Sequence, residues 1–233
     1  DKCLMNIYFL VEGKTEADVY PAWLSYLIPE LQKVDNYEDA EQNNYYLFSS
    51  YGIPSIYNDI PNAIEDINRS AKYNYFVVCV DSDAATVAQR EEKILRLLEE
   101  NIRLNDASLK IIVQNRCIET WFLGNRKVYT RYPQNNPKFI EYSAFYNISQ
   151  NNPELMKKPD TFEGSIAEFH FRYLKSMFNE RGNMSYSKAN VAVVQGLSYF
   201  KELQSRVDDE PSHLATFTNF LQFCNKLKAE IAR

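Results

Sequence analysis

Four acidic residues stand directly after two apolar segments of this chain. Glu12 follows the segment Leu4 to Val11, and Glu16 comes soon after it. Asp81 and Asp83 follow a second apolar segment. Carboxylates that lie close together repel one another unless a cation neutralises them. Because oxygen ligands without histidine or thiolate favour Mg²⁺ or Mn²⁺ over zinc, the pattern predicts a magnesium site.

Two buried strands are expected to hold these acids. Residues 4–11 and 75–80 are nearly continuous in apolar side chains, as in a parallel sheet that is covered on both faces. In an open α/β sheet, ligands bind outside the carboxyl ends of the strands. If the second strand continues far enough, Asp81 and Asp83 share one face, while Ser82 points away. An isolated Asp-x-Asp pair has an alternative interpretation as a helix-capping turn.

Gly13-Lys14-Thr15 invites a different interpretation, the end of a phosphate-binding P-loop. That motif requires a glycine five residues before Gly13, and Tyr8 occupies this position. Without a glycine-rich loop, the backbone cannot cradle a nucleoside triphosphate. P-loop chemistry is therefore not expected.

The remaining pattern predicts an α/β sheet flanked by helices, with a helical C-terminal elaboration. Further strands are expected at 45–50 and 109–113, and helices at 15–27, 60–71 and 87–102, with a loop at 35–44. Pro21 is expected to cause a kink or a short break in the first helix, and Pro61 to lie in the first turn of the second. Residues 125–160 show no sustained period, and helices are expected at 165–179, 188–194, 197–206 and 213–231. These patterns predict an α/β core over residues 1–124 and a mostly helical region over 125–233, packed on the core.

Composition indicates an ordinary folded protein. The chain has 233 residues, of which 45% are hydrophobic and 14% aromatic, so a well-filled core is expected. No apolar run approaches the roughly 18 residues that a membrane span requires. No signal peptide is predicted either, which makes a cytoplasmic location the expectation.

The cysteines Cys3, Cys79, Cys117 and Cys224 are scattered along the chain. They show no paired spacing, and neither histidine lies where it would complete a zinc site. We expect reduced thiols in the core.

Charge is distributed unevenly along the chain. Residues 1–109 carry 9 basic and 19 acidic side chains, whereas residues 110–188 carry 12 basic and 7 acidic side chains. An acidic, metal-binding half beside a basic middle segment suits a phosphodiester substrate. The alternative is that the charged residues are exposed to solvent and unevenly distributed by chance.

The two acidic motifs carry a family resemblance. Val11-Glu-Gly-Lys-Thr-Glu16 and Val80-Asp-Ser-Asp83 resemble the two signature motifs of the Toprim domain, in the correct order. Topoisomerases, bacterial primases, a ribosomal RNA maturation nuclease and the overcoming-lysogenization-defect nucleases share that domain. The resemblance covers roughly residues 4–124 and implies a Rossmann-like sheet.

The resemblance also implies roles for the four acids. In that family the first glutamate acts as an acid or base or as a metal ligand, and the two aspartates hold divalent metal. Glu12 would take the first role, and Asp81 and Asp83 the second. Glu16 would be a further ligand, as in the nuclease branch.

Three later residues extend the match. The segment Arg116-Cys-Ile-Glu-Thr-Trp-Phe-Leu resembles one in small defence-associated Toprim nucleases, where Glu119 would bind a second metal and Arg116 a phosphate. The alternative is an ion pair at the start of an amphipathic helix. Lys188 is expected at the start of a helix, where it would steady the phosphate in the transition state; a solvated lysine is the alternative. Lys14 is expected to contact the substrate.

These expectations favour hydrolysis over other Toprim chemistry. The chain is too small for a topoisomerase gate, and its cysteines do not form the zinc module of a primase. The prediction is a nuclease that cleaves DNA, in preference to RNA, with two Mg²⁺ or Mn²⁺ ions as part of an antiphage system. An ABC-type ATPase is the partner that the resemblance implies. The alternatives are an RNA-processing Toprim nuclease and a non-catalytic, metal-binding subunit of an ATPase complex.

Overall fold

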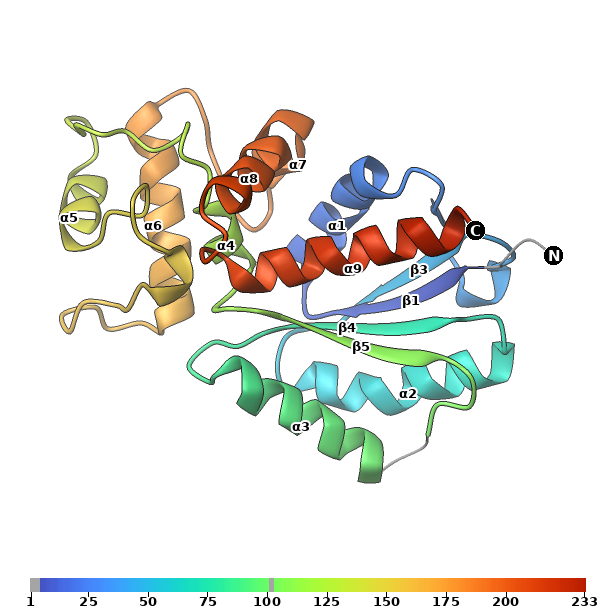
Figure 1. Ribbon diagram of the computed structural model, residues 1–233. Coiled ribbons are helices and arrows are strands. Elements are labelled where there is room, and N and C mark those ends of the chain that lie inside the picture. Colours follow the sequence, from blue (N-terminus) through green and yellow to red (C-terminus); the bar gives the residue numbers. More distant parts are fainter. Residues whose placement is uncertain (1–4, 101–102) are drawn as a thin grey trace. The chain divides into compact units, whose positions relative to one another are not determined.

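The computed structural model describes residues 5–100 and 103–233, and the strands within them form a five-stranded sheet (Figure 1). The strand order is β2-β3-β1-β4-β5. The strands are β1 (Asn6–Val11), β2 (Gln32–Lys33), β3 (Asn44–Ser49), β4 (Tyr75–Asp81) and β5 (Ser108–Gln114). All of these strands run parallel, which confirms the predicted sheet type.

The two strands that precede the acidic motifs are neighbours in this sheet. In the register of β1 and β4, Ile7 pairs with Tyr75 and Val11 pairs with Cys79. All of β1 is buried, as its continuous apolar sequence predicts. The carboxyl ends of β1 and β4 therefore lie at the same edge of the sheet.

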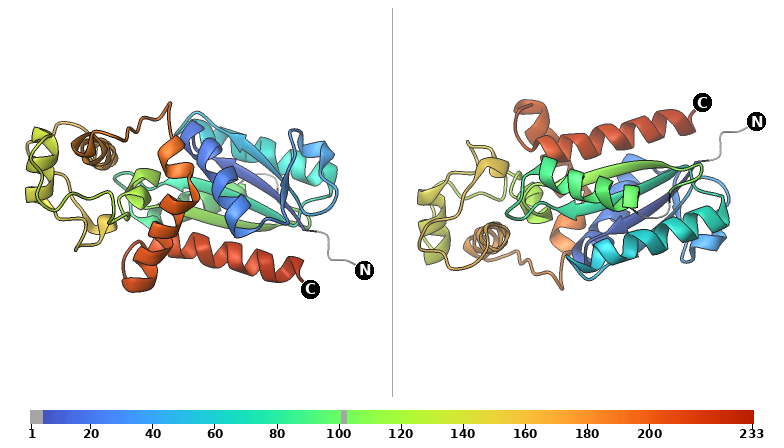
Figure 2. Two further views of the ribbon diagram at one scale, coloured as in Figure 1. Left: turned by 90° about the horizontal axis from the view of Figure 1, so that it is seen from above. Right: turned by 90° about the horizontal axis from the view of Figure 1, so that it is seen from below.

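Helices cover both faces of the sheet (Figures 1 and 2). On one face, α2 (Ser55–Ser70) and α3 (Val87–Glu100) contribute Ile60, Ile64 and Ile94 to a core that includes Leu10 and Val78. These contacts bury the apolar stripes of both helices.

On the other face, α1 (Lys14–Leu27) packs beside the C-terminal part of α9 (Ala215–Ile231). The ring of Tyr20 in α1 stacks on Phe220 in α9, with centroids 5.2 Å apart. The ring of Tyr75 in β4 meets Phe223 in α9 edge-on, at 5.5 Å. The last helix is thus part of the α/β layer that covers the sheet.

By its contacts the chain divides into two compact units. The first comprises residues up to Val80, Val87–Val113 and Asn219–Arg233; the second comprises Asp81–Thr86 and Gln114–Thr218. The divisions fall inside β4, β5 and α9. Each unit therefore consists of segments that are distant in the sequence.

The second unit is mostly helical. It contains α4 (Ile118–Phe122), α5 (Pro137–Phe145), α6 (Ile166–Arg181), α7 (Ala192–Gln195), α8 (Leu197–Asp209) and the first turn of α9. Short 3₁₀ helices lie at Tyr37–Asp39 in the first unit and Pro153–Leu155 in the second. Among the described residues of both units, no helix is long and apolar enough to cross a membrane.

A buried arginine joins several segments of the second unit. The side chain of Arg206 is only 1% exposed. It donates hydrogen bonds to the carbonyl oxygens of Gly124 at 3.4 Å, Ile148 at 2.7 Å and Asn151 at 3.1 Å. It also donates to Nδ1 of His213 at 3.1 Å. Burial lowers the pKa of Arg206 to about 10, so the guanidinium remains charged at neutral pH.

Some local predictions were wrong. α1 continues through Pro21, so the break that was an alternative there does not occur, while the kink stays a prediction. α2 begins at Ser55, which places Pro61 inside the helix rather than in its first turn. β2 was not predicted, and neither was α5 within the region that lacks a sustained period. The buried apolar face of α2 stabilises that helix in spite of the hydrogen-bond donor that proline lacks.

Candidate active site

Glu12 lies immediately beyond the last residue of β1 and is half-buried. Its backbone carbonyl accepts a hydrogen bond from the N–H of Gly52 at 2.8 Å, and Ser50 N–H donates to the carbonyl of Val11 at 2.9 Å. The turn between β1 and α1 is therefore fixed against the segment that follows β3. Gly13 then begins α1 as its N-cap, in an extended conformation.

Glu16 lies in the first turn of α1 and is only 5% exposed. A methyl group placed on Gly13 would lie 3.5 Å from Oε2 of Glu16, so the carboxylate lies over the turn. Burial raises the pKa of the Cys79 thiol, and the negative charge of Glu16 acts in the same direction. Glu16 is thus close enough to β4 for its charge to act on that strand.

Lys14 begins α1 at the surface, with its side chain 72% exposed. Its ammonium group forms an ion pair with Asp18, one turn further along the helix, at 2.6 Å. An exposed pair of this kind contributes little to stability. The substrate-binding role of Lys14 stays a prediction.

In the second unit, Asp81 is the last residue of β4. Its Oδ1 accepts a hydrogen bond from Nε2 of Gln114, at the end of β5, at 2.6 Å. Ser82 is fully buried, and its backbone N–H donates to the carbonyl of Gln114 at 3.0 Å. The side chain of Asp81 is therefore anchored to the neighbouring strand.

Asp83 lies beyond the strand, in a turn with a φ angle of 50°. The strand therefore ends too early for the alternation of side chains to place Asp83 on the same face as Asp81. A left-handed conformation at a non-glycine residue is uncommon, and aspartate tolerates it better than most residues. The turn, rather than the strand, sets the position of the second aspartate.

Arg116 holds this turn in place. Its Nη1 donates to the carbonyl oxygens of Asp83 at 3.0 Å and of Ala85 at 3.1 Å. In return, the N–H of Asp83 donates to the carbonyl of Arg116 at 3.0 Å. The observed contacts of Arg116 position Asp83, and its predicted contact with phosphate stays a prediction.

Glu119 lies in the first turn of α4, 2% exposed, and accepts a hydrogen bond from the hydroxyl of Tyr186 at 3.1 Å. Burial raises the pKa of the nearby Cys117 thiol, and the negative charges of Glu119 and Asp81 act in the same direction. The second unit therefore places two of the predicted site carboxylates near one buried thiol. Cys79, Cys117 and Cys224 are free and buried, as predicted; Cys3 lies outside the described residues.

The sequence did not reveal a histidine that stabilises this region. His170 is fully buried, and its Nε2–H donates to the carbonyl of Met156 at 2.8 Å. Its Nδ1 therefore accepts from the hydroxyl of Thr120 at 2.7 Å. The hydroxyl oxygen of Thr120 accepts in turn from the backbone N–H groups of Arg116 at 3.2 Å and Cys117 at 3.3 Å. This chain of hydrogen bonds fixes the backbone that carries Arg116.

His170 is expected to make the free energy of unfolding depend on pH. Burial, together with the positive charge of Arg116, lowers the pKa of His170 to about 4. The unfolded chain binds this proton at higher pH, so the stabilising contribution is complete above about pH 6.5 and is lost as pH falls toward 4. The lowered pKa corresponds to a loss of about 3 kcal/mol.

Urea denaturation of the unaltered protein and of His170→Gln between pH 4 and pH 7.5 measures this contribution. The variant lacks the titrating group, so the difference in unfolding free energy between the two proteins should shrink as pH falls. A difference that stays constant over this range would show that His170 does not titrate as the structure implies.

The structure corrects the predicted setting of Lys188. Ser187 and Asn190 form an isolated bridge around it, and α7 begins only at Ala192. Lys188 therefore lies in a turn rather than at a helix N-terminus. Its ammonium group lies over the ring of Phe171, 5.5 Å from the centroid.

The donor atoms of the acidic residues suit magnesium, because carboxylate oxygens are the ligands that this ion prefers. The chemistry of the donor set therefore fits magnesium. Within residues 5–100 and 103–233, no three His, Cys, Asp or Glu side chains are grouped so that they could hold a metal ion.

Comparison of the chain with known protein families, with curated proteins and with solved structures finds no match. The fold is therefore described by its own topology, an α/β fold with a parallel five-stranded sheet within the described residues and a C-terminal helical region.

Proposed function

We propose that the chain is a Toprim-type nuclease that hydrolyses phosphodiester bonds with the help of divalent metal ions. One observation carries this proposal: β1 and β4, whose carboxyl ends precede the two acidic motifs, are adjacent and parallel in the sheet. In α/β sheets, ligands bind at this edge. If the turns after β1 and β4 served only to connect strands to helices, acidic residues would not be needed after both strands.

The proposed roles follow from chemistry and position. Glu12, at the end of β1, acts on the substrate as an acid or base or as a metal ligand. Asp81 and Asp83, with Glu16 and Glu119, provide the carboxylates for two Mg²⁺ or Mn²⁺ ions.

The proposed substrate is nucleic acid, with DNA preferred to RNA. The basic segment 110–188 supplies most of the second unit, and it carries 12 basic and 7 acidic side chains. Such a surplus attracts phosphate backbones and makes binding dependent on salt. Within this proposal the protein acts in the cytoplasm as the effector of an antiphage system, with an ABC-type ATPase as its partner.

Cleavage assays with supercoiled plasmid, linear DNA and RNA test the proposal. With Mg²⁺ in excess over the protein, we expect plasmid nicking that EDTA abolishes and Mn²⁺ restores. Each substrate should be tested with the protein alone and with an ABC-type ATPase and ATP added.

Each outcome of this assay tests a different part of the proposal. Cleavage of RNA but not of DNA would replace the proposed substrate with the RNA-processing alternative. The absence of metal-dependent cleavage of every substrate, with and without the ATPase, would refute the nuclease proposal. Cleavage that is unaffected by EDTA would refute its metal dependence.

A further inference from the structure

A pocket of about 410 Å³ lies between α5 and α6, entirely within the second unit. Pockets of a few hundred cubic ångströms are typical of sites for small ligands. Its lining combines cationic, aromatic and amide side chains, including Lys138, Arg172, Lys175, Tyr142, Phe162 and Asn179. This combination suits a ligand that has both an anionic part and a flat ring.

The cations of the pocket come from both helices. Lys138 in α5 pairs with Glu141 at 3.5 Å, and Arg172 in α6 pairs with Glu168 at 3.8 Å. Both ion pairs are exposed and are therefore weak. Lys175, one turn after Arg172, is half-buried and forms no ion pair with any residue that the structure describes. The lining of the pocket thus has an excess of positive charge.

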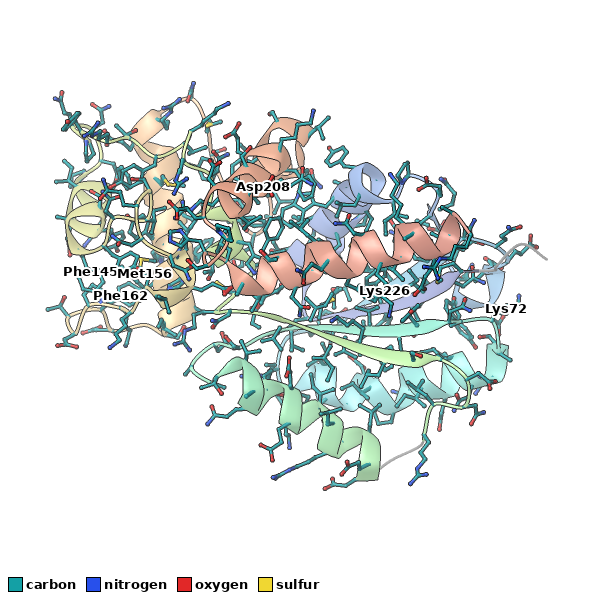
Figure 3. All side chains as sticks on the ribbon, in the orientation of Figure 1. Lys72, Phe145, Met156, Phe162, Asp208 and Lys226 are labelled. Carbon is teal, nitrogen blue, oxygen red and sulfur yellow. The ribbon has the colours of Figure 1, made fainter. Side chains whose placement is uncertain are left out.

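Phe162, labelled in Figure 3, provides an apolar ring in the lining that also contains these cations. The ring is half-buried and meets Phe169 of α6 edge-on, with centroids 5.3 Å apart. The loop that carries it is held by Lys158, whose ammonium group donates to the carbonyl oxygens of Phe162 at 3.1 Å and Gly164 at 2.7 Å. The aromatic wall is therefore held in position without any ligand.

The opposite end of the pocket is fixed as well. The carboxylate of Glu180, in the last turn of α6, accepts hydrogen bonds from the backbone N–H groups of Gln134 at 2.7 Å, Asn135 at 3.0 Å and Asn136 at 2.6 Å. These contacts connect the end of α6 to the start of α5, where Asn136 is the N-cap. A preformed pocket binds its ligand with a smaller loss of conformational entropy.

We propose that this pocket binds a nucleotide, with the phosphate on Lys138, Arg172 and Lys175 and the base against Phe162. Cations beside an aromatic ring are the usual means by which proteins hold the phosphate and base of one nucleotide. A free nucleotide and a nucleotide within a single strand share this chemistry. The proposal does not depend on the hydrolysis proposed above, because the pocket contains none of the acids assigned to that reaction.

Isothermal titration calorimetry in the presence of EDTA tests binding without cleavage. The probes are adenosine 5′-monophosphate, adenosine, inorganic phosphate and a single-stranded oligothymidylate of five nucleotides. We expect the monophosphate to bind more tightly than adenosine or phosphate, because each of these occupies only half of the site. Tighter binding of the oligothymidylate would identify a strand as the source of the nucleotide, and tighter binding of the monophosphate a free nucleotide.

Two variants assign this binding to the pocket. Lys175→Gln and Phe162→Ala should each weaken it about tenfold or more, through loss of a charged contact and of stacking, respectively. Lys157→Gln, which removes an exposed charge outside the pocket, is the matched control and should leave the affinity unchanged. Three results would each overturn the proposal: no saturable binding of either nucleotide probe, phosphate binding as tight as that of the monophosphate, or affinities that neither pocket variant alters.

Discussion

Glu12→Gln is expected to lower the rate of magnesium-dependent cleavage by about 10²- to 10⁴-fold, the loss typical of removing a positioned acid–base group. The substitution preserves the size of the side chain but removes its charge and replaces one accepting oxygen with an NH₂ donor. Since the backbone of Glu12 is held through its carbonyl by Gly52, the turn should keep its conformation. Initial rates of plasmid nicking, measured over a range of Mg²⁺ concentrations, provide the comparison.

Asp81→Asn is the companion variant. The amide oxygen of asparagine can still accept the hydrogen bond from Gln114, so only the charge is lost from the end of β4. We expect a loss of rate of similar size, about 10²- to 10⁴-fold. If both strand ends serve one reaction, the double variant should lose little more than either single variant.

Glu99→Gln is the matched control, because Glu99 is exposed on α3. Its cleavage rate should equal that of the unaltered protein, and the thermal midpoints of all three single variants should agree within about 2 °C. Full activity in both Glu12→Gln and Asp81→Asn would refute the assigned site even if the protein proved to be a nuclease.

Arg206→Ala is expected to lower the free energy of unfolding by at least about 3 kcal/mol. The substitution leaves the carbonyls of Gly124, Ile148 and Asn151 without their donor, and each buried unsatisfied group costs about 1–3 kcal/mol. It also leaves a cavity where a fully buried side chain had packed. Urea denaturation followed by circular dichroism at pH 7 measures the change.

Two further variants show whether this effect is specific. Arg206→Lys keeps the charge but cannot donate to all three carbonyls at once, so its stability should be intermediate. Arg181→Ala removes an exposed arginine from the last turn of α6 and should change stability by less than about 1 kcal/mol. An Arg206→Ala protein as stable as Arg181→Ala would contradict the role inferred for the buried guanidinium.

The apolar residues of three strands made them predictable from the sequence. β1, β4 and β5 lie within two residues of their expected bounds, since β1 and β4 are mostly apolar and β5 contains the apolar run Ile111 to Val113. β2 spans only Gln32–Lys33, and so short a strand leaves no period in the sequence. The start of α5 was predictable from the sequence, because Asn136 followed by Pro137 is a common way to begin a helix.

The candidate site was predictable only where its residues are close in the sequence. The predicted helix at 188–194 failed because Ser187 and Asn190 bond to each other's backbone, and such local bonds compete with helix formation. The contacts of His170 with Thr120 and Met156 could not be predicted, since they join residues that are distant in the chain. Packing of the second unit, rather than local pattern, brings them together.

The position of α9 has a consequence for how the protein folds during its synthesis. Part of one face of the sheet is covered by Phe220 and Phe223, which the ribosome adds after all of the strands that the structure describes. Until these rings arrive, the aromatic side chains of Tyr20, Trp23 and Tyr75 lack partners from α9. The nascent sheet is therefore expected to expose apolar surface to which chaperones can bind. This surface becomes buried only when α9 has been synthesised and has packed against it.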